Sequence, residues 1–244
     1  MTGSPVTLSV VSHGQIDLVN QFLDDLSRHC PEELCVILTH NIPEPAASLP
    51  SNWRHRLEVI ANDDQKGFGA NHNTAFRRCV TPLFCVANPD IRLSGNPFPI
   101  LAAALERSRV AVAGPLVLDP QGRAEDSARK FPTAGRLLHK LFTPPKGPDY
   151  RVSDSPIEVD WLAGMFMAFR AEAFRAVKGF DERFYLYYED VDICARLSRR
   201  GYSVVYAPEA RITHDARRAS RRDMRLMRIH LASALRYLST TYRR

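Results

Sequence analysis

The sequence predicts a single α/β domain built on a mostly parallel central sheet flanked by helices. Two observations favour this fold class. Apolar runs of strand length alternate with stretches of helical periodicity from residue 6 to residue 118, which is the pattern of a parallel sheet with crossover helices. The chain is 244 residues long and 45% hydrophobic, which is enough for one such domain with a substantial core. Disorder as the main state is therefore excluded.

Five apolar runs in the N-terminal half are expected to be strands, and three stretches between them are expected to be helices. The first helix begins at Ile16, shows apolar residues at helical spacing, and is closed by Pro31. The expected strands are Val6–Ser12, Leu34–Thr39, Leu57–Ala61, Leu83–Ala87 and Val110–Leu118, and the other expected helices are Ala70–Cys79 and Pro97–Arg107.

The C-terminal half is less regular. From Asp119 to Ser155 the composition shifts to proline, glycine, serine and charge, so an irregular and mobile excursion is expected over 119–155. The stretch before Gly201 has acids in its first turn and arginines in its last, which is typical of a helix that ends there. We expect one domain over 1–219 and a basic amphipathic helix over 220–244. The expected strands are Glu158–Arg170, Ser203–Ala207 and Arg211–His214, and the expected helices are Glu172–Val177 and Glu189–Arg200.

The C-terminal segment combines positive charge with an apolar side. Residues 211–244 contain ten arginines and two aspartates, a charge of +8 in a chain whose net charge is +6. Such a segment suits an anionic partner such as a membrane surface, a diphosphate or a nucleic acid. We expect peripheral contact with a membrane or a lipid diphosphate, and no nucleic-acid partner, because the helix also has an apolar side; docking of the helix on the domain is the alternative. That side consists of Met224, Met227, Leu231, Leu235 and Leu238.

The cysteines and the apolar runs predict the compartment. The five cysteines are odd in number and include no CxxC pair, which favours a reducing compartment over a disulfide framework or a zinc site. No N-terminal stretch resembles a signal peptide, and the longest apolar run, Trp161–Phe169, is too short to cross a bilayer. The expectation is a cytoplasmic protein, with peripheral attachment to the inner face of the membrane.

The first candidate for chemistry is Asn88-Pro89-Asp90, directly after the strand expected at Leu83–Ala87. Ligands of open α/β sheets bind beyond the carboxyl ends of the strands, so these side chains are expected to face a cleft. A carboxylate at that place can hold a hard divalent cation, which neutralises a diphosphate. All three residues also favour turns, so a plain turn is the competing interpretation.

The second candidate is an acidic segment interleaved with aromatics, from Asp181 to Asp192. Carboxylates beside buried aromatic rings cost free energy unless they are paired or functional. Asp190 and Asp192 are about 200° apart on a helix, so they cannot share one face. Asp192 precedes Arg196 by four residues, the spacing of an ion pair, which leaves Asp190 as the candidate general base. The competing interpretation is an acidic first turn that only stabilises the helix dipole.

Two weaker signals complete the set. Gly67-Phe68-Gly69 enters a short helix, where two glycines allow close backbone approach and the helix N-terminus offers N–H groups to an anion. The segment lacks the third glycine of a dinucleotide fingerprint and the Lys-Ser/Thr of a phosphate-binding loop, which disfavours an NAD enzyme or an NTPase. His214 ends a strand ahead of the arginines, although a lone histidine is more often a packed or surface residue than a ligand.

In this order the motifs resemble the inverting glycosyltransferases of family 2, and in particular the bacterial rhamnosyltransferase-like branch. The resemblance runs from Val6 to about Ser220 and implies a GT-A (Rossmann-like) fold. Its pieces are Leu8–His13, Gly67–Asn73, Asn88–Asp90, Val159–Gly164, Gly179–Glu182, Tyr188–Asp192, and Ala207-Pro208 leading to His214.

The resemblance implies a role for each matching residue. Asp90 stands where the DxD motif of the family holds the metal, Asp190 matches the acid that deprotonates the acceptor hydroxyl, and His214 matches a histidine that helps to hold the metal or the diphosphate. The implied cofactor is Mg²⁺ or Mn²⁺. The residues implied at the nucleotide-sugar donor are Val11, Ser12, His13, Asn41, Gly67, Gly69, Asn73 and Asn88, and those implied beside the sugar and acceptor are Trp161, Gly164 and Glu189.

The implied activity is transfer of a sugar from a nucleotide diphosphate donor to a hydroxyl of a bacterial surface glycan or lipid-linked saccharide, with L-rhamnose from dTDP-rhamnose as the guess. Thr39-His40-Asn41 stands where the family usually has an Asp-Asn pair, which leaves the identity of the nucleotide open. Gln65-Lys66 stands where the family commonly has Asn-x. One alternative is a nucleotidyltransferase, which normally has a basic, glycine-rich phosphate loop near its N-terminus; the segment Val11–Gly14 has no such basic cluster. The other alternative is a non-catalytic nucleotide-sugar-binding protein of the same fold. The acceptor, the linkage and the oligomeric state stay open.

Overall fold

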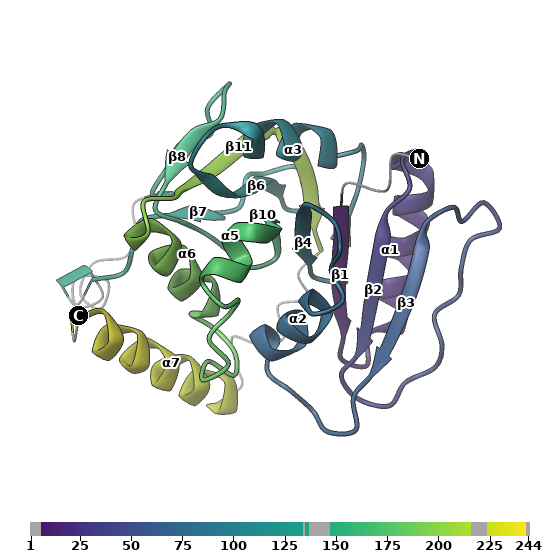
Figure 1. The fold of residues 1–244 in the computed structure, drawn as a ribbon, viewed down its shortest axis with the longest axis horizontal. Helices are drawn as coiled ribbons and strands as arrows, with labels where there is room; N and C mark the ends of the chain where they lie inside the picture. Colours follow the sequence, from purple (N-terminus) through teal and green to yellow (C-terminus); the bar gives the residue numbers. More distant parts are fainter. Residues whose placement is uncertain (1–5, 134, 137–146, 216–223, 243–244) are drawn as a thin grey trace.

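The computed structural model describes residues 6–133, 135–136, 147–215 and 224–242, and it has helices on both faces of one large sheet (Figure 1). The N-terminal half supplies four parallel strands and two helices that follow the sequence prediction closely. The strands are β1 (Val6–Ser12), β2 (Cys35–His40), β3 (Arg56–Ala61) and β4 (Leu83–Ala87), and the helices are α1 (Ile16–His29) and α2 (Phe68–Phe76). Helix α2 begins two residues earlier and ends three residues earlier than predicted.

The central sheet has nine strands and is mixed rather than purely parallel. Its order is β3-β2-β1-β4-β10-β6-β11-β5, with β8 paired to β11. Strand β10 (Phe166–Arg170) runs antiparallel to both of its neighbours, β4 and β6 (Val110–Leu118), and so joins the two parallel parts of the sheet. The remaining elements near this part are β5 (Ile91–Arg92), α3 (Phe98–Glu106) and α5 (Ala171–Ala176).

Two predictions for the C-terminal half need correction. The run predicted as a single strand over Glu158–Arg170 is three strands, because the chain turns at Asp160 and again around Gly164: β8 (Ile157–Val159), β9 (Trp161–Leu162) and β10. The two strands predicted after Gly201 are instead one, β11 (Ser203–His214), whose register against β6 shifts between Ala207 and Arg211. Helix α6 (Glu189–Arg199) agrees with its prediction, and Gly201 after it has a φ of +80°.

Part of the excursion predicted over 119–155 lies outside the described residues, namely 134 and 137–146. The described part contains one short strand, β7 (Ala128–Arg129), which pairs with β9 in a separate two-stranded sheet. A tight turn precedes it, in which the Asp119 carboxylate accepts hydrogen bonds from the backbone N–H groups of Gln121 and Arg123. The described part of the excursion thus adjoins the sheet, and its predicted mobility stays a prediction.

The hydrophobic core lies on both faces of the sheet, and strand residues alternate between the two sides. Phe84 and Val86 of β4 face one side, and Cys85 of the same strand faces the other. Helices α1 and α3 cover the side that Cys85 faces, whereas α2, α5 and α6 cover the opposite side. Strand β4 lies between these two layers of helices, so the polar residues that follow it lie at its carboxyl end, where open α/β sheets bind ligands.

The last helix, α7 (Met224–Tyr242), docks on the domain mainly by a different side from the apolar one predicted, of which only Leu238 among the described residues packs against the core. Ala234 and Tyr237 are the buried residues that join the core, and Ser233 donates a hydrogen bond to the carbonyl of Leu186 at 2.9 Å. Four of the five residues of the predicted apolar side are 58–68% exposed: Met224, Met227, Leu231 and Leu235. The start predicted at residue 220 lies outside the described residues, as do the arginines at 217, 218, 221 and 222. No helix in the described part of the chain has the length and hydropathy needed to cross a bilayer.

Candidate active site

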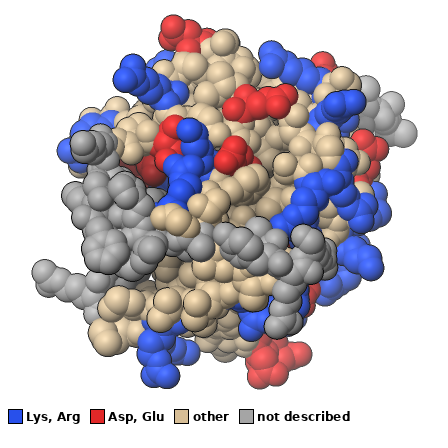
Figure 2. All heavy atoms as spheres, turned by 90° about the vertical axis from the view of Figure 1, so that its left-hand side faces the viewer, with Lys and Arg blue, Asp and Glu red and all other residues tan. Residues whose placement is uncertain are grey.

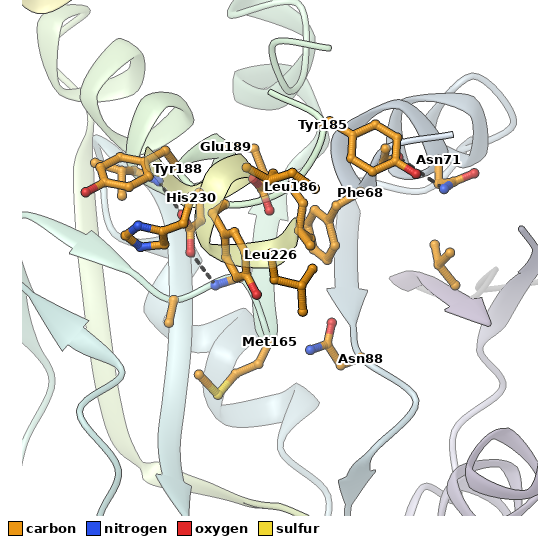
Figure 3. A pocket seen from close by; sticks show the side chains of 18 of the residues that line it. Phe68, Asn71, Asn88, Met165, Tyr185, Leu186, Tyr188, Glu189, Leu226 and His230 are labelled. Carbon is orange, nitrogen blue, oxygen red and sulfur yellow. Dashed lines mark hydrogen bonds between the residues drawn. The ribbon is translucent and has the colours of Figure 1, made fainter. Parts of the chain in front are cut away.

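A cavity of about 820 Å³ opens where β1 and β4 end, between the start of α6 and helix α7. Figure 3 shows Asn88 and Met165 across this cavity from Leu186 and Glu189, with Leu226 of α7 beside them. Most of the site residues predicted from the sequence line this one cavity, although they come from seven separate parts of the chain. They are Val11, His13, Asn41, Gly67, Asn88, Asp90, Trp161, Gly164, Glu189, Asp190 and His214.

The first charged centre of the cavity joins Asp90 to His214. Asp90 lies between β4 and β5, and His214 ends β11, which pairs with β5. The Nε2 atom of His214 is 3.3 Å from Oδ2 of Asp90, and its Nδ1 atom is 2.9 Å from Oε2 of Glu125. Burial by itself lowers the pKa of His214. The hydrogen bonds and charges of the two carboxylates outweigh this effect and raise the pKa to about 9.

The Asp90 centre fits a divalent cation that a substrate helps to hold. The Oδ1 atom of Asp90 is buried and has no hydrogen-bond partner among the described residues, which leaves a hard oxygen ligand available. In the described part of the chain no group of three or more His, Cys, Asp or Glu side chains forms a complete metal site. Mg²⁺ at a phosphate site commonly uses one or two carboxylates together with phosphate oxygens and water, and the carboxylate of Asp90 is a ligand of that kind.

The second charged centre is Asp190, in the first turn of α6. Its Oδ2 atom accepts a hydrogen bond from the backbone N–H of Gly164 at 2.9 Å, and its Oδ1 atom accepts one from the N–H of Val191 at 2.8 Å. Burial raises the pKa of Asp190 above its ordinary value, and the two N–H groups, with the charge of Arg129, partly oppose this shift. A carboxylate with a raised pKa is a better proton acceptor than an ordinary aspartate.

The backbone before Asp190 is strained. Tyr187 and Tyr188 have φ values of +69° and +71°, a left-handed conformation that is rare for bulky side chains. Such a conformation costs free energy, so the surrounding contacts must hold it. The ring of His230 on α7 contacts both tyrosine rings, with centroid separations of 5.2 and 5.3 Å. Helix α7 therefore supports the turn that directs Asp190 into the cavity.

Glu189 lies beside Asp190 but in a different environment. It is 5% exposed, and its Oε2 atom has no hydrogen-bond partner among the described residues. Burial and the neighbouring charge of Asp190 raise the pKa of Glu189 well above its ordinary value. Asp192, by contrast, forms the predicted ion pair with Arg196, whose Nε atom is 2.6 Å from Oδ2 of Asp192. The three neighbouring acids thus lie in three different environments.

Three residues predicted at the donor lie outside the cavity lining. The hydroxyl of Ser12 donates to Glu44, whose other carboxylate oxygen is 2.9 Å from Nδ1 of His40. The amide of Asn73 bonds to the backbone of Phe180 through both of its ends. Gly69, the third, faces the same residue, because a Cβ there would lie 2.6 Å from the Cβ of Phe180. These residues hold the walls of the site in place.

Gly67 does line the cavity, but the need for glycine has a different cause from the one predicted. A Cβ at Gly67 would lie 2.5 Å from the carbonyl oxygen of Tyr185, so the close approach is between two parts of the protein. The N–H of Phe68, at the start of α2, donates to that same carbonyl at 2.9 Å. One N–H group expected to be free for an anion is thus bound to the loop that leads to Asp190.

Asn41 is both a cavity residue and a brace for its rim. Its Oδ1 accepts from the N–H of Lys66 at 2.8 Å, and its Nδ2 donates to the carbonyl of Lys66 at 2.9 Å. Asn62 donates to both Asn41 and Asn71. This amide network fixes the position of Lys66 at the rim of the cavity.

Sequence reasoning missed a group of basic residues in the cavity. Arg129, Lys130 and Arg136 line the cavity from the excursion, and Arg225 lines it from α7. The guanidinium of Arg129 lies over the ring of Trp161, and the indole Nε1 donates to the carbonyl of Lys130 at 3.0 Å. The pairing of β7 with β9 creates this arrangement, and no short motif in the sequence signals such a pairing.

Comparison with known proteins decides the family. Residues 90–238 match the model of the family described as glycosyl transferase family group 2. The chain belongs to this family. The matched range contains both charged centres of the cavity, Asp90 with His214 and Asp190, and family membership speaks against the nucleotidyltransferase alternative.

Two relatives within this glycosyltransferase family are rhamnosyltransferases. The N-acetylglucosaminyl-diphospho-decaprenol L-rhamnosyltransferase of Mycobacterium tuberculosis is 37% identical over 148 residues, which cover 57% of this chain and 48% of that protein. This chain thus matches about half the length of that relative. The rhamnosyltransferase WbbL of Escherichia coli K12 is 28% identical over 249 residues, which cover 96% of this chain and 92% of that protein.

Solved structures show the fold of this glycosyltransferase family member to be GT-A. GalNAc-T7 with UDP, GalNAc and Mn²⁺ superposes with a TM-score of 0.65 at 15% identity, covering 88% of this chain and 43% of that one. A mannosyltransferase from Pyrobaculum calidifontis in complex with GDP-mannose and Mn²⁺ gives a TM-score of 0.62 at 17% identity, covering 95% and 64%. The predicted fold class is confirmed.

Proposed function

We propose that this protein is an inverting glycosyltransferase that moves a sugar from a nucleotide diphosphate to a hydroxyl of a glycan or lipid-linked saccharide. The observation that carries the proposal is the convergence of two carboxylates, Asp90 and Asp190, on one cavity. One has a bare buried oxygen for a cation, and the other has a raised pKa and faces the same space. Family membership, given above, supports the reaction class.

In this proposal Asp190 is the general base. Hydrogen bonds from Gly164 and Val191 fix its carboxylate, so that it can accept the proton of the acceptor hydroxyl as that oxygen attacks the anomeric carbon. The bond from the anomeric carbon to the diphosphate breaks as the new glycosidic bond forms, and the nucleoside diphosphate leaves with the bonding electrons. A single displacement inverts the configuration and needs no covalent intermediate.

Asp90 and His214 would hold Mg²⁺ or Mn²⁺ at the diphosphate. The cation, when bound, supplies positive charge that stabilises the leaving diphosphate. Support comes from the unpartnered oxygen of Asp90 and from the Mn²⁺ named with both structural neighbours. The residues proposed around the donor are Val11, His13, Asn41, Gly67 and Asn88.

The donor and acceptor proposed are dTDP-L-rhamnose and a lipid-linked saccharide. The names of the two bacterial relatives support the sugar, and the mycobacterial name also describes a lipid diphosphate acceptor. The basic residues Arg129, Lys130 and Arg225 on the acceptor side of the cavity suit an acceptor that carries phosphate. Thermal shift with a panel of nucleotide sugars and Mn²⁺ tests the donor, because specific binding raises the apparent melting temperature.

The exposed face of α7 is proposed to lie on an anionic membrane surface. Helix α7 contains three arginines and no acid, and its four exposed apolar residues recur on one side. Figure 2 views this side of the molecule, where Lys and Arg, and also Asp and Glu, lie among uncharged surface. Because Leu226 and His230 of the same helix line the cavity, a lipid-linked acceptor would reach the site from that surface.

The decisive experiment compares Asp190→Asn with Asp154→Asn, an exposed aspartate away from the cavity. Asp190→Asn should keep donor binding and lower turnover by roughly a hundredfold or more, the range expected for loss of a general base. Asp154→Asn should change neither. Turnover near the wild-type value in Asp190→Asn would remove that residue from the role. If the wild-type protein neither transfers nor hydrolyses the donor with Mn²⁺, the non-catalytic alternative holds.

A further inference from the structure

Glu125 is an acidic residue next to the proposed cation site that neither the motifs nor the family resemblance assigns. It follows β6 in the excursion, 89 positions before His214, and its Oε2 atom is 2.9 Å from Nδ1 of His214. The opposite nitrogen of the ring, Nε2, lies 3.3 Å from Oδ2 of Asp90. The imidazole is therefore held between two carboxylates, one on the cavity side and one behind it.

The backbone holds Glu125 in place. Its N–H donates to the carbonyl of Val117 at 2.8 Å, and its carbonyl accepts from the N–H of Ser127 at 2.9 Å. A bridge between Leu118 and Ala124 closes the turn before it. The side chain is 23% exposed, and among the described residues its carboxylate contacts the imidazole of His214, so its position is set by the fold rather than by solvent.

The hydrogen bond between Glu125 and His214 decides which ring nitrogen can bind a cation. An ionised carboxylate only accepts hydrogen bonds, so the Nδ1 atom of a neutral His214 must carry the hydrogen when it faces Glu125. When the ring is charged, its second hydrogen lies on Nε2 and faces Asp90, and a cation bound by Asp90 would displace this hydrogen and meet the lone pair of Nε2. Histidines that bind metals commonly donate their second N–H to a carboxylate, which fixes the tautomer and the ring orientation.

We propose that Glu125 is a positioning residue that orients His214 so that Nε2 shares a divalent cation with Asp90. The inference rests on the proposed function, because it assumes the cation site described there. It adds a residue that does not touch the cation itself and acts only through the imidazole. Loss of this residue should therefore weaken cation binding, and only while His214 is present.

The experiment measures Mn²⁺ affinity of the full chain in the presence of dTDP, by the loss of the free-ion signal in electron paramagnetic resonance. Glu125→Gln should raise the Kd for Mn²⁺ by roughly tenfold to a hundredfold, the range found when such a partner of a metal ligand is removed. Glu158→Gln, at an exposed glutamate on β8, is the matched control and should leave the Kd unchanged. Thermal melts confirm that each variant is folded.

A double-mutant cycle separates positioning from simple charge attraction. In the His214→Ala background, the further change Glu125→Gln should have no effect on the Kd for Mn²⁺. An equal loss in both backgrounds would show that Glu125 attracts or binds the ion directly, which overturns the inference. If Asp90→Asn and His214→Ala lose Mn²⁺ but Glu125→Gln does not, the cation site stands and the role of Glu125 fails. If none of these variants changes the affinity, the proposed cation site itself is wrong.

Discussion

The two carboxylate centres of the cavity are built in opposite ways. Asp90 lies at the ends of sheet strands, contacts the side chain of His214, and keeps one oxygen without a partner. Asp190 lies on a helix after two strained tyrosines, and backbone N–H groups bond to both of its oxygens. The first arrangement suits a carboxylate that acquires a ligand, whereas the second suits one that stays in place and accepts a proton. The predictions below test this division.

The largest effect expected is at the Asp90 centre. Asp90→Asn removes the charge that would hold the cation, so Mn²⁺ affinity and transfer should both fall, on the order of a hundredfold, because a bound metal contributes several kcal/mol to stabilising the leaving group. High Mn²⁺ concentration should restore part of the activity. Isothermal titration and steady-state kinetics measure the two quantities. Asp190→Asn is the matched comparison, since it should lose turnover but keep Mn²⁺ affinity; equal Mn²⁺ affinities in all three proteins would contradict the division.

The next effect concerns α7, which supports the Asp190 side through His230. The double change Leu231→Gln and Leu235→Gln should lower binding to vesicles of phosphatidylglycerol and phosphatidylcholine by roughly tenfold or more, since each exposed leucine contributes about 1.5–3 kcal/mol when fully buried in an apolar phase. Transfer to a water-soluble acceptor should not change, because neither leucine lines the cavity. Cosedimentation measures the binding.

Leu49→Gln is the control for α7, because Leu49 is also exposed, at 46%, but lies far along the chain from this helix. It should leave vesicle binding intact. Vesicles of phosphatidylcholine alone should bind the wild-type protein weakly, since the arginines then have no anionic partner. Unchanged binding of the double variant to the anionic vesicles would leave α7 as a helix that only docks on the domain.

A smaller effect is expected where the two sides of the cavity touch. Gly67→Ala places a methyl group against the Tyr185 carbonyl and should cost about 1–3 kcal/mol of stability, the range for overpacking a close contact. Turnover should also fall, because the same loop leads to Asp190. Gly95→Ala is the matched control, as a Cβ there meets nothing within 4 Å. Chemical denaturation and kinetics on both variants measure the difference; equal stability would show that the contact is loose.

The sequence predicts the Asp90 side better than the Asp190 side, for a physical reason. Asp90 follows the apolar strand Leu83–Ala87, and the place beyond a buried strand end is determined locally by the strand pattern. Strands β1, β2, β3, β4 and β6 and helix α1 are local in the same sense, and their bounds agree with the prediction almost to the residue, whereas the two-residue strand β5 is not predicted. The ion pair between Asp192 and Arg196, predicted from helical spacing, is confirmed, and the role of Asp190 as the base stays a prediction.

What the sequence did not predict depends on contacts between distant segments. Gly67 is glycine because of Tyr185, and Glu125 meets His214 only after the excursion returns to the sheet. The apolar side of α7 has the period of a docked helix, yet the docked side carries Ser233, Ala234 and Tyr237. Periodicity shows that a helix has an apolar side, but it does not show which side another element covers.

The smallest effect is expected at Glu189, the neighbour of Asp190. Its raised pKa should appear as a pH dependence of the stability of the folded protein. The folded protein raises the pKa of Glu189 well above its ordinary value of 4.5 because the side chain is buried beside Asp190. The folded state therefore binds this proton more tightly than the unfolded chain does, so its contribution to stability is complete below pH 4.5 and is lost as pH rises through the folded pKa. Glu189→Gln cannot lose a proton, and its melting temperature relative to wild type should rise over the same pH range by a few degrees at most.

Glu172→Gln is the control for this pH dependence, because the side chain of Glu172 is 72% exposed. Its melting temperature should follow that of the wild-type protein at every pH. Since glutamine has the shape of a neutral glutamic acid, Glu189→Gln should also keep turnover within a few-fold of wild type, unlike Asp190→Asn. A melting-temperature difference that stays flat from pH 4 to pH 8 would mean that Glu189 is ionised in the folded protein. The unpartnered Oε2 atom would then need a ligand, and Glu189 would belong with Asp90 rather than with the base.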